Sequence, residues 1–292
     1  MIDLEDRILI AVPKKGRLKE ITLDYLKKIG LSFNQKDRFD ISLCSATPLA
    51  LVFLPAADIP LYLSKGRVSY GITGQDMVAE KGLEDELNEV MPLGYGKCSV
   101  CIAAPQNLKV TPQSLENKTI ATSFPYLTQK YFNQTLNIQQ IIIKIINGSV
   151  EIAPTLGTAH AVVDLVETGS TLRAAGLEVI DTLMTSEAVL LAKKNLGFKE
   201  QEWLLKIKTR LTGVLTAQQY LLLDYNIPKK ALKLAEKITP GFNSPTIMPL
   251  EQEEWVAIRS VIQKKEKYEV IEKLKEIGAQ AILVSQMDYF QS

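Results

Sequence analysis

Short apolar runs alternate with amphipathic stretches in the part of the chain before residue 200. Runs rich in β-branched residues are typical of buried strands, and apolar positions three and four apart are typical of helices. The predicted strands are 7–13, 50–54, 68–74, 118–123, 141–147 and 161–166. The predicted helices between and after them are 18–30, 56–66, 75–82, 126–136 and the residues after 171. Strands that alternate with helices indicate an α/β fold of βαβ units, with mixed, mainly parallel sheets.

Two further strand-like segments, 94–105 and 185–194, are not separated from their neighbours by a helix. They are placed to carry the chain into a second lobe and back again, so two sheets fit the pattern better than one. Ligands of such folds bind beyond the carboxyl ends of the strands. We therefore expect a ligand site in a crevice between two α/β lobes.

A different order of elements follows the long amphipathic segment 199–219. Strand, helix, strand, strand, helix and strand are predicted at 219–226, 228–239, 244–250, 254–263, 267–278 and 279–287. This βαββαβ order is typical of a ferredoxin-like domain. Such a domain either stabilises an oligomer or binds a ligand, and the pattern alone does not choose between these roles. The predicted domains are lobe I at 1–95 plus 185–215, lobe II at 96–184 and the C-terminal domain at 216–292.

The charges of the chain nearly cancel, with 34 Lys plus Arg against 33 Asp plus Glu in 292 residues. Because there is no long basic run, no binding to nucleic acid or to an anionic membrane is indicated. The start of the chain, MIDLEDRILIAVP, lacks the basic beginning and apolar core of a signal peptide. No apolar run reaches the roughly 18 residues of a membrane span. We therefore expect a cytoplasmic protein in which any anion is held by a local site.

The cysteine and histidine content excludes several kinds of site. Cys44, Cys98 and Cys101 are an odd number of cysteines without an export signal, so a disulfide framework is not expected. Cys98 and Cys101 form a CxxC inside a predicted strand, where positions three apart point to opposite faces, which favours core thiols over a redox or metal pair. His160 is the only histidine, so neither a histidine-based metal cluster nor a Ser/His/Asp triad is available.

The most informative segment is the end of strand 161–166 and the residues after it. Backbone N–H groups at the start of a helix have no partner within the helix and point at a bound phosphate. The hydroxyl and glycine residues that provide such a cradle are Thr168, Gly169, Ser170 and Thr171. Asp164, just upstream, is better suited to ribose hydroxyls or to a magnesium ion than to the phosphate itself. The segment therefore indicates a sugar 5-phosphate site, and the alternative on local sequence alone is that TGST only caps a helix.

At this point the chain resembles a known family. EIAPTLG, AVVDLV and TGSTL together resemble the signature of the ATP phosphoribosyltransferases. Further segments similar to that family occur in its order: VPKKGRL, GITGQD, IATSFPYL, NGSVE, SEAVLL, QYLLLDYN, ITPG, SPTIMPL, WVAIR and GAQAILV. The resemblance covers essentially the whole chain, and the C-terminal third resembles the long form of the family. It implies a two-lobed, periplasmic-binding-protein-like catalytic region followed by a ferredoxin-like regulatory domain.

The resemblance also implies an activity. The phosphoribosyl group of phosphoribosyl pyrophosphate is transferred to N1 of ATP, pyrophosphate is released, and Mg²⁺ is required. This reaction is the first step of histidine biosynthesis, and histidine is the expected feedback inhibitor of a homo-oligomer between a dimer and a hexamer. An adenine ring nitrogen is already nucleophilic, so the absence of a histidine base is compatible with this chemistry. Alignment and neutralisation of charge are then the main tasks of the protein.

Carried over to this sequence, the resemblance implies roles for individual residues. The TGST segment binds the 5-phosphate, Asp164 binds the ribose hydroxyls, and Glu151 positions the ribose or the magnesium. The loop after the first strand offers cations for the ATP phosphates or the pyrophosphate: Lys14, Lys15 and Arg17. Their alternative is a solvated basic turn. The protein ligands of magnesium are not assigned.

Residues after two other strands are further candidates. Thr122 and Tyr126 follow strand 118–123, and Tyr126 is expected either to stack on a base or to pack in the core. Asp76 follows GITG, and an N-cap of the next helix is favoured there over contact with substrate.

Three positions differ from the pattern usual in the family. Ser69 and His160 each replace an acid, and Pro55 stands where an Arg is common. We expect them around the substrate cleft, with His160 partly buried. Ser69 and Pro55 support the alternative hypothesis of a two-lobed, non-catalytic sensor of a nucleotide or of histidine.

The C-terminal domain resembles a histidine sensor. Asp224 is the candidate for the amino group or the imidazole of the ligand. Ser244 and Thr246 flank Pro245 at the next strand, and Ala279 follows Gly278 near the last strand. On sequence alone, these residues fit caps and turns equally well.

Overall fold

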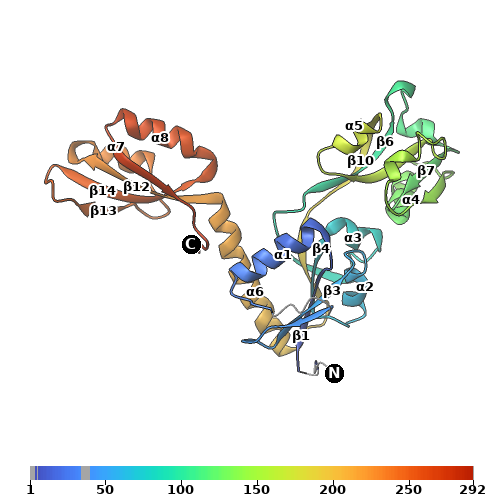
Figure 1. Cartoon of the computed structure of the whole chain (residues 1–292), viewed down its shortest axis with the longest axis horizontal. Coiled ribbons are helices and arrows are strands. Elements are labelled where there is room, and N and C mark those ends of the chain that lie inside the picture. The colour runs from blue at the N-terminus through green and yellow to red at the C-terminus, as the bar shows by residue number, and fades with distance from the viewer. Residues whose placement is uncertain (1–3, 5, 34–39, 292) are drawn as a thin grey trace. The chain divides into compact units, whose positions relative to one another are not determined.

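The structure is a computed structural model, and it describes residues 4, 6–33 and 40–291. The chain forms two compact units, one of Met1–Lys27 with Leu31–Leu204 and one of Lys28–Gly30 with Leu205–Ser292 (Figure 1). The division of the first unit into lobes I and II stays a prediction. In the described part of the chain, no helix combines the length and the apolar character of a membrane span.

The first unit contains a six-stranded sheet in the order β2-β3-β1-β4-β11-β5. Its strands are β1 (Ile8–Pro13), β2 (Ile41–Leu43), β3 (Leu49–Leu54), β4 (Tyr70–Gly74), β5 (Leu87–Pro92) and β11 (Ala188–Lys193). Strand β1 is parallel to β3 and β4, and the other pairs are antiparallel. The helices between these strands are α1 (Gly16–Lys28), α2 (Ile59–Ser64) and α3 (Gln75–Glu80). Ala11, Leu63 and Val189 are fully buried beneath them.

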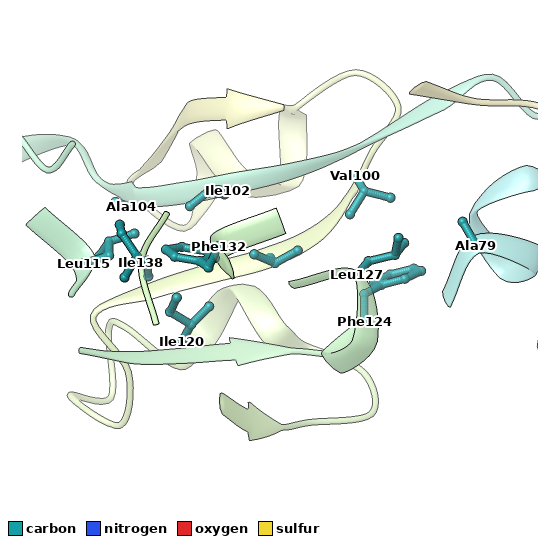
Figure 2. Close-up of a cluster of buried hydrophobic side chains, with 12 residues drawn as sticks. Ala79, Val100, Ile102, Ala104, Leu115, Ile120, Phe124, Leu127, Phe132 and Ile138 are labelled. Carbon is teal, nitrogen blue, oxygen red and sulfur yellow. The ribbon is translucent and has the colours of Figure 1, made fainter. Parts of the chain in front are cut away.

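The second sheet of this unit has five strands in the order β10-β6-β9-β7-β8. They are β6 (Cys98–Pro105), β7 (Thr119–Thr122), β8 (Ile142–Ile145), β9 (Ala161–Val166) and β10 (Leu177–Ser186). The helices are α4 (Pro125–Gln134) and α5 (Ser170–Ala174), with a 3₁₀ turn at Val150–Ile152. Figure 2 shows its core, in which Phe132 lies with Ile102 and Ile120. Each fully buried side chain of this size stabilises the fold by about 1.5–3 kcal/mol.

Both sheets are mixed, as expected, with a larger antiparallel share than the pattern predicted. The difference comes from three strands that sequence analysis did not identify: β2, β5 and β10. Strand β10 is an edge strand whose pairing with β6 is interrupted by irregularities near residues 179–181 and 182–184. Its side chains are mostly exposed or half-buried, so no apolar run marks it.

The C-terminal unit begins with α6 (Phe198–Gln219), of which Leu205 onward belongs to it. The elements β12 (Tyr220–Pro228), α7 (Leu232–Ile238), β13 (Thr246–Pro249), β14 (Trp255–Gln263), α8 (Lys267–Glu276) and β15 (Gln280–Ser285) follow. The sheet order is β13-β14-β12-β15, and all neighbours are antiparallel. Alternate β12 residues, including Leu223 and Ile227, are buried in a core cluster with residues of α7 and α8. Figure 1 shows these two helices on one face of the sheet. The predicted ferredoxin-like order is confirmed.

Candidate active site

Three parallel strands of the second sheet end at one edge. Strand β9 pairs with β7, Val163 opposite Thr122, and β7 pairs with β8, Thr122 opposite Ile145. Because the carboxyl ends of neighbouring parallel strands lie together, the segments after them meet. Asp164 lies in the last half of β9 and the TGST segment follows this strand. Thr122 ends β7, and Glu151 lies in the 3₁₀ turn after β8. Sheet topology thus brings together residues that are far apart in the sequence.

Glu151 lies close enough to Asp164 to affect the ionisation of Asp164. Burial raises the pKa of Asp164, the N–H of Leu165 lowers it in part, and the negative charge of Glu151 raises it again. The Leu165 N–H donates to Asp164 Oδ1 at 2.8 Å. A pair of neighbouring carboxylates of this kind can accept hydrogen bonds from hydroxyl groups or bind a cation.

The TGST segment forms the turn between β9 and α5. Gly169 is the N-cap of α5 and has φ +70°, a conformation that favours glycine. The hydroxyl oxygens of Thr168 and Ser170 lie 3.0 Å apart. Arg173 Nη2 donates to the Thr168 carbonyl at 3.1 Å, which places a guanidinium beside the turn. Arg173 was not among the predicted residues, although a cation one helical turn after the glycine is a signal for anion binding.

A cavity of about 440 Å³ lies beside the end of β9 in the same unit. It is lined by Arg17, Leu18, Ile21, Ala56, Gly74, Asp76, Met77, Gly96, Lys97, Cys98, Leu165 and Glu167. Arg17 Nη1 is 2.9 Å from Glu167 Oε2, and both side chains are exposed. Lys97 and Glu167 were not among the predicted residues, because each lies outside a recognised motif.

Lys14 and Lys15, in the loop after β1, do not line the cavity. Lys14 Nζ is 2.8 Å from Asp40 Oδ1, and Lys15 is exposed. Of the three predicted cations, only Arg17, the second residue of α1, lines the cavity. Substrate contact by any of the three stays a prediction.

Thr122 is fully buried and its hydroxyl is engaged within the fold. Thr122 Oγ1 donates to the Val163 carbonyl and accepts from the Phe124 N–H, each at 2.8 Å. Tyr126 is 46% exposed, and its hydroxyl lies beside Gly82. Stacking of Tyr126 on a base stays a prediction.

Asp76 lines the cavity but does not start its helix. The N-cap of α3 is Gly74, so the expectation that Asp76 is the N-cap is wrong. The Ser186 hydroxyl donates to Asp76 Oδ1 at 2.6 Å, and Asp76 N–H donates back to Ser186 Oγ at 3.0 Å. Burial raises the pKa of Asp76, and the Ser186 bond lowers it in part.

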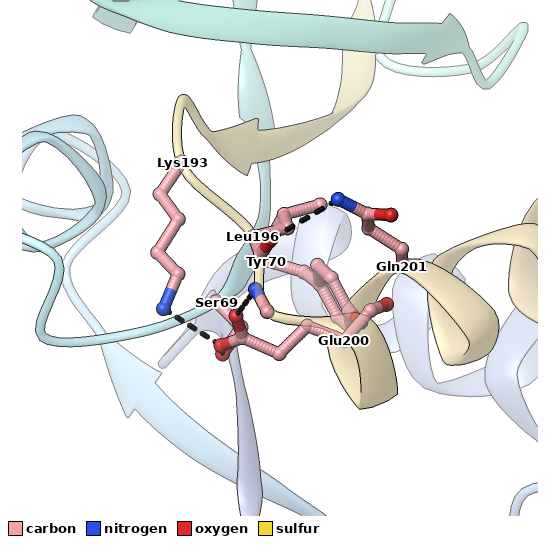
Figure 3. Close-up of polar contacts among 7 residues, drawn as sticks. Ser69, Tyr70, Lys193, Leu196, Glu200 and Gln201 are labelled. Carbon is pink, nitrogen blue, oxygen red and sulfur yellow. Dashed lines mark hydrogen bonds and ion pairs between the residues drawn. The ribbon is translucent and has the colours of Figure 1, made fainter.

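Two of the three unusual positions lie away from the cleft. Ser69 precedes β4, at the opposite end from Gly74, and its hydroxyl donates to Glu200 (Figure 3). Glu200 also accepts from Lys193 at 2.7 Å, and the Tyr70 hydroxyl donates to the Glu200 carbonyl. Ser69 therefore belongs to the junction between the first sheet and the start of α6.

His160 is at the amino end of β9, opposite to Asp164. It is exposed rather than partly buried as expected, and its Nδ1 accepts from the Thr119 N–H at 3.2 Å. Pro55 follows β3, next to the cavity residue Ala56. Of the three replacements, only Pro55 adjoins the cavity.

In the C-terminal domain, one row of cross-strand neighbours joins two of the predicted regulatory residues, Thr246 and Asp224. Thr246 on β13 is opposite Arg259 on β14, which is opposite Asp224 on β12. Arg259 Nε donates to Asp224 Oδ1 at 2.8 Å. Ser244 is exposed before β13, and the Ala279 N–H donates to the Leu274 carbonyl at 2.9 Å after α8. Their regulatory roles stay predictions.

Comparison with known proteins places the chain in a family. A family model described as ATP phosphoribosyltransferase matches residues 55–213, and one described as HisG, C-terminal domain, matches residues 217–289. The chain is 44% identical to an ATP phosphoribosyltransferase of Candida glabrata, over 96% of this chain and 95% of that protein. It is 42% identical to one of Schizosaccharomyces pombe, over 98% and 97%.

A solved structure with a similar fold is the ATP phosphoribosyl transferase (HisG:HisZ) complex of Thermotoga maritima. The TM-score is 0.61 at 27% identity, with 70% of this chain and 98% of that chain covered. Together with the two α/β sheets, these matches define the protein as an enzyme of the transferase class. The chain belongs to the ATP phosphoribosyltransferase family, which catalyses the first step of histidine biosynthesis. The catalytic hypothesis is thereby favoured over the non-catalytic sensor.

Proposed function

We propose that the edge formed by β8, β7 and β9 binds phosphoribosyl pyrophosphate and that the phosphoribosyl group is transferred there to N1 of ATP. The observation that carries this proposal is that Asp164, Glu151 and the TGST turn lie at one sheet edge. A carboxylate for the ribose hydroxyls and a glycine turn for the 5-phosphate are thus supplied by one segment, residues 164–171.

The chemistry needs alignment more than proton transfer. The lone pair of adenine N1 forms a bond to ribose C1, and the bond from C1 to the pyrophosphate oxygen breaks with its electron pair. Asp164 orients the ribose through its hydroxyls, and the TGST turn fixes the other end of the sugar. Arg17 and Lys97, which line the adjoining cavity, are cations that can neutralise the phosphates.

The carboxylates at this sheet edge are suited to bind a magnesium ion that is also bound by the substrate phosphates. Among the described residues, no three His, Cys, Asp or Glu side chains form a cluster suited to a metal ion. Magnesium is commonly bound by one or two carboxylates together with substrate phosphates, and Asp164 with Glu151 is such a pair. When bound, the ion neutralises charge on the departing pyrophosphate.

A direct assay tests the activity. The pure protein, incubated with ATP, Mg²⁺ and phosphoribosyl pyrophosphate in the presence of a pyrophosphatase, is expected to form phosphoribosyl-ATP, measured by its ultraviolet absorbance. Omission of either substrate is the control. If no product forms at any substrate concentration, the transferase proposal for this chain is wrong.

We also propose that histidine binds the C-terminal domain at Asp224 and inhibits the enzyme. The Asp224 carboxylate is paired with Arg259 across the strands, so a ligand amino group competes with this guanidinium. Inhibition requires that histidine bind one state of the protein more tightly than another.

Asp224→Ala is expected to weaken inhibition by histidine at least about tenfold, because the ligand loses a charge-assisted hydrogen bond. Arg259→Gln is the matched control: it removes the other half of the ion pair and keeps the carboxylate, so inhibition persists at an equal or lower histidine concentration. The half-inhibitory histidine concentration is measured for both variants. Wild-type inhibition of Asp224→Ala would contradict the assignment.

The other parts of the proposal concern assembly and location. We propose a homo-oligomer in the range from dimer to hexamer, and the Thermotoga maritima relative, itself a complex, supports an assembled state. Sedimentation of the purified protein with and without histidine measures the size. A cytoplasmic location is proposed from the sequence and from the biosynthetic role.

A further inference from the structure

Helix α4 has no N-terminal cap of its own. Its N-cap residue is Phe124, which makes no side-chain cap and is only 3% exposed because it packs in the core. Pro125 follows and has no N–H group. The Thr128 N–H is already bonded to the Phe124 carbonyl. The N–H groups of Tyr126 and Leu127 therefore need acceptors from elsewhere.

Glu80 supplies both acceptors from another part of the unit. Its Oε1 accepts from the Tyr126 N–H and its Oε2 from the Leu127 N–H, each at 3.0 Å. Glu80 is the last residue of α3, which follows a strand of the first sheet, and it is 46 residues before Tyr126. A carboxylate at a helix N-terminus is favoured by the helix dipole and by charge-assisted hydrogen bonds.

Further contacts join α3 and the turn after it to α4. A Cβ at Gly82 would lie 2.9 Å from the Tyr126 hydroxyl oxygen, so the turn after α3 closely approaches this ring. Lys130 Nζ is 3.4 Å from Glu84 Oε1. Ala79 of α3 joins the second sheet's core cluster near Leu127 (Figure 2). The contact is therefore an interface, and Glu80 is its bidentate polar link.

The other end of α3 reaches the cavity. Asp76 lines the cavity and is bonded to Ser186, the last residue of β10. Helix α4 begins three residues after Thr122, the last residue of β7. Strand β7 pairs with β9, which contains Asp164. The short helix α3 thus connects the cavity to the turn between β7 and α4.

We propose that Glu80 is a positioning residue for the transfer reaction. Its carboxylate holds the turn between β7 and α4 in place relative to the cavity beside Asp76. The proposal rests on the proposed function, because it places the reacting groups at this edge. Glu80 does not touch the reacting atoms. Glu80 keeps the turn between β7 and α4 in a fixed position relative to the cavity beside Asp76. Its loss therefore lowers kcat and leaves the phosphate cradle intact, because the residues of the cradle all belong to the segment after β9.

The test compares Glu80→Ala and Glu80→Gln with the control Glu84→Gln. Glu84 is also an acid close to α4, and its carboxylate pairs with a side chain, that of the partly exposed Lys130. Hydrogen exchange of a peptide covering residues 124–128, the amount of phosphoribosyl pyrophosphate bound at saturation and kcat per bound equivalent are measured. Counting sites by binding corrects kcat for any unfolded protein.

For Glu80→Ala we expect exchange at 126 and 127 to be at least about tenfold faster, and kcat per site to fall about tenfold to 100-fold. Affinity for phosphoribosyl pyrophosphate stays within about twofold. Glu80→Gln shows the same changes in smaller measure, because its amide retains one acceptor and turns a donor toward the other N–H. Glu84→Gln behaves as the wild type.

Faster exchange with unchanged kcat per site would overturn the proposal, because Glu80 would then be only a helix cap. Unchanged exchange together with unchanged kcat would overturn it as well. If Glu80→Ala does not fold, the same measurements on Glu80→Gln decide. Failure of the wild type to bind phosphoribosyl pyrophosphate would instead contradict the proposed function, so the two failures are distinguishable.

Discussion

Replacing Gly169 by valine is expected to weaken the binding of phosphoribosyl pyrophosphate about 100-fold or more while the protein stays folded. Gly169 has φ +70°, which valine adopts poorly, and a Cβ there would lie 3.0 Å from Arg173 Nη1. The backbone N–H groups of the turn would move away from the 5-phosphate. Hydrogen bonds to charged groups contribute about 1.5–3 kcal/mol each, so losing one or two explains a change of this size.

Gly176 provides a matched control in the same unit, after α5. It has φ +73°, and a Cβ there would meet no atom within 4 Å. Gly176→Val therefore introduces similar backbone strain away from the cradle, and its affinity for phosphoribosyl pyrophosphate should equal that of the wild type. Calorimetric titration measures affinity, and urea unfolding measures stability. If Gly169→Val binds as tightly as Gly176→Val, the TGST segment is only a helix start.

Local features of the site could be predicted from the sequence. The TGST turn is read from four consecutive residues, because small and hydroxyl side chains after an apolar run specify a strand-to-helix turn without help from the rest of the chain. The ferredoxin-like order was likewise predictable, because alternate residues of β12 and β14 are buried and mark half-buried strands.

Features that depend on distant partners could not be predicted. Asp76 is of a residue type that is preferred at helix N-caps, yet its side chain is hydrogen-bonded to Ser186, 110 residues later. Glu80 resembles any surface acid at the end of a helix until the fold places it at the start of α4. In each case the local sequence allows several partners, and only tertiary packing selects one.

The unusual positions show the same limit. Ser69 was expected near the substrate because it stands where the family usually has an acid. Its place before β4 puts it at the amino end of a strand, whereas ligands bind at carboxyl ends. There it shares Glu200 with Lys193. A replaced residue therefore affects the ligand site only if it lies at the end of the strand where the ligand binds.

Asp164→Asn is expected to lower kcat/KM about 100-fold to 1000-fold. The amide has the shape of the carboxylate, but it offers one acceptor in place of two and no charge near the ribose carbon at which positive charge develops. Loss of one or two charge-assisted hydrogen bonds accounts for this range. Steady-state kinetics of the variant, with Glu151→Gln in parallel, measure the effect.

The pH dependence separates the two acids. Asp164 must be ionised to accept two hydroxyl groups, and burial and Glu151 both raise its pKa, so activity falls as the pH is lowered through this raised value. Glu151→Gln removes a negative neighbour and lowers the pKa of Asp164. The acidic limb of its kcat/KM profile is therefore expected at lower pH than in the wild type. Ionisation of the substrates affects both profiles equally, and an unshifted limb would contradict the coupling of the two acids.

Stability distinguishes a catalytic role for Asp164 from a structural one. A folded-state pKa above the unfolded value means that the native protein binds the proton more tightly, so the free energy of unfolding falls as the pH rises from the unfolded to the folded pKa. At neutral pH the ionised Asp164 therefore destabilises the fold, and Asp164→Asn should be as stable as the wild type or more stable. Urea unfolding at neutral pH tests this. A variant that loses stability together with activity would show that Asp164 is mainly structural, whereas lost activity with retained stability is the signature of a residue held ionised for its substrate.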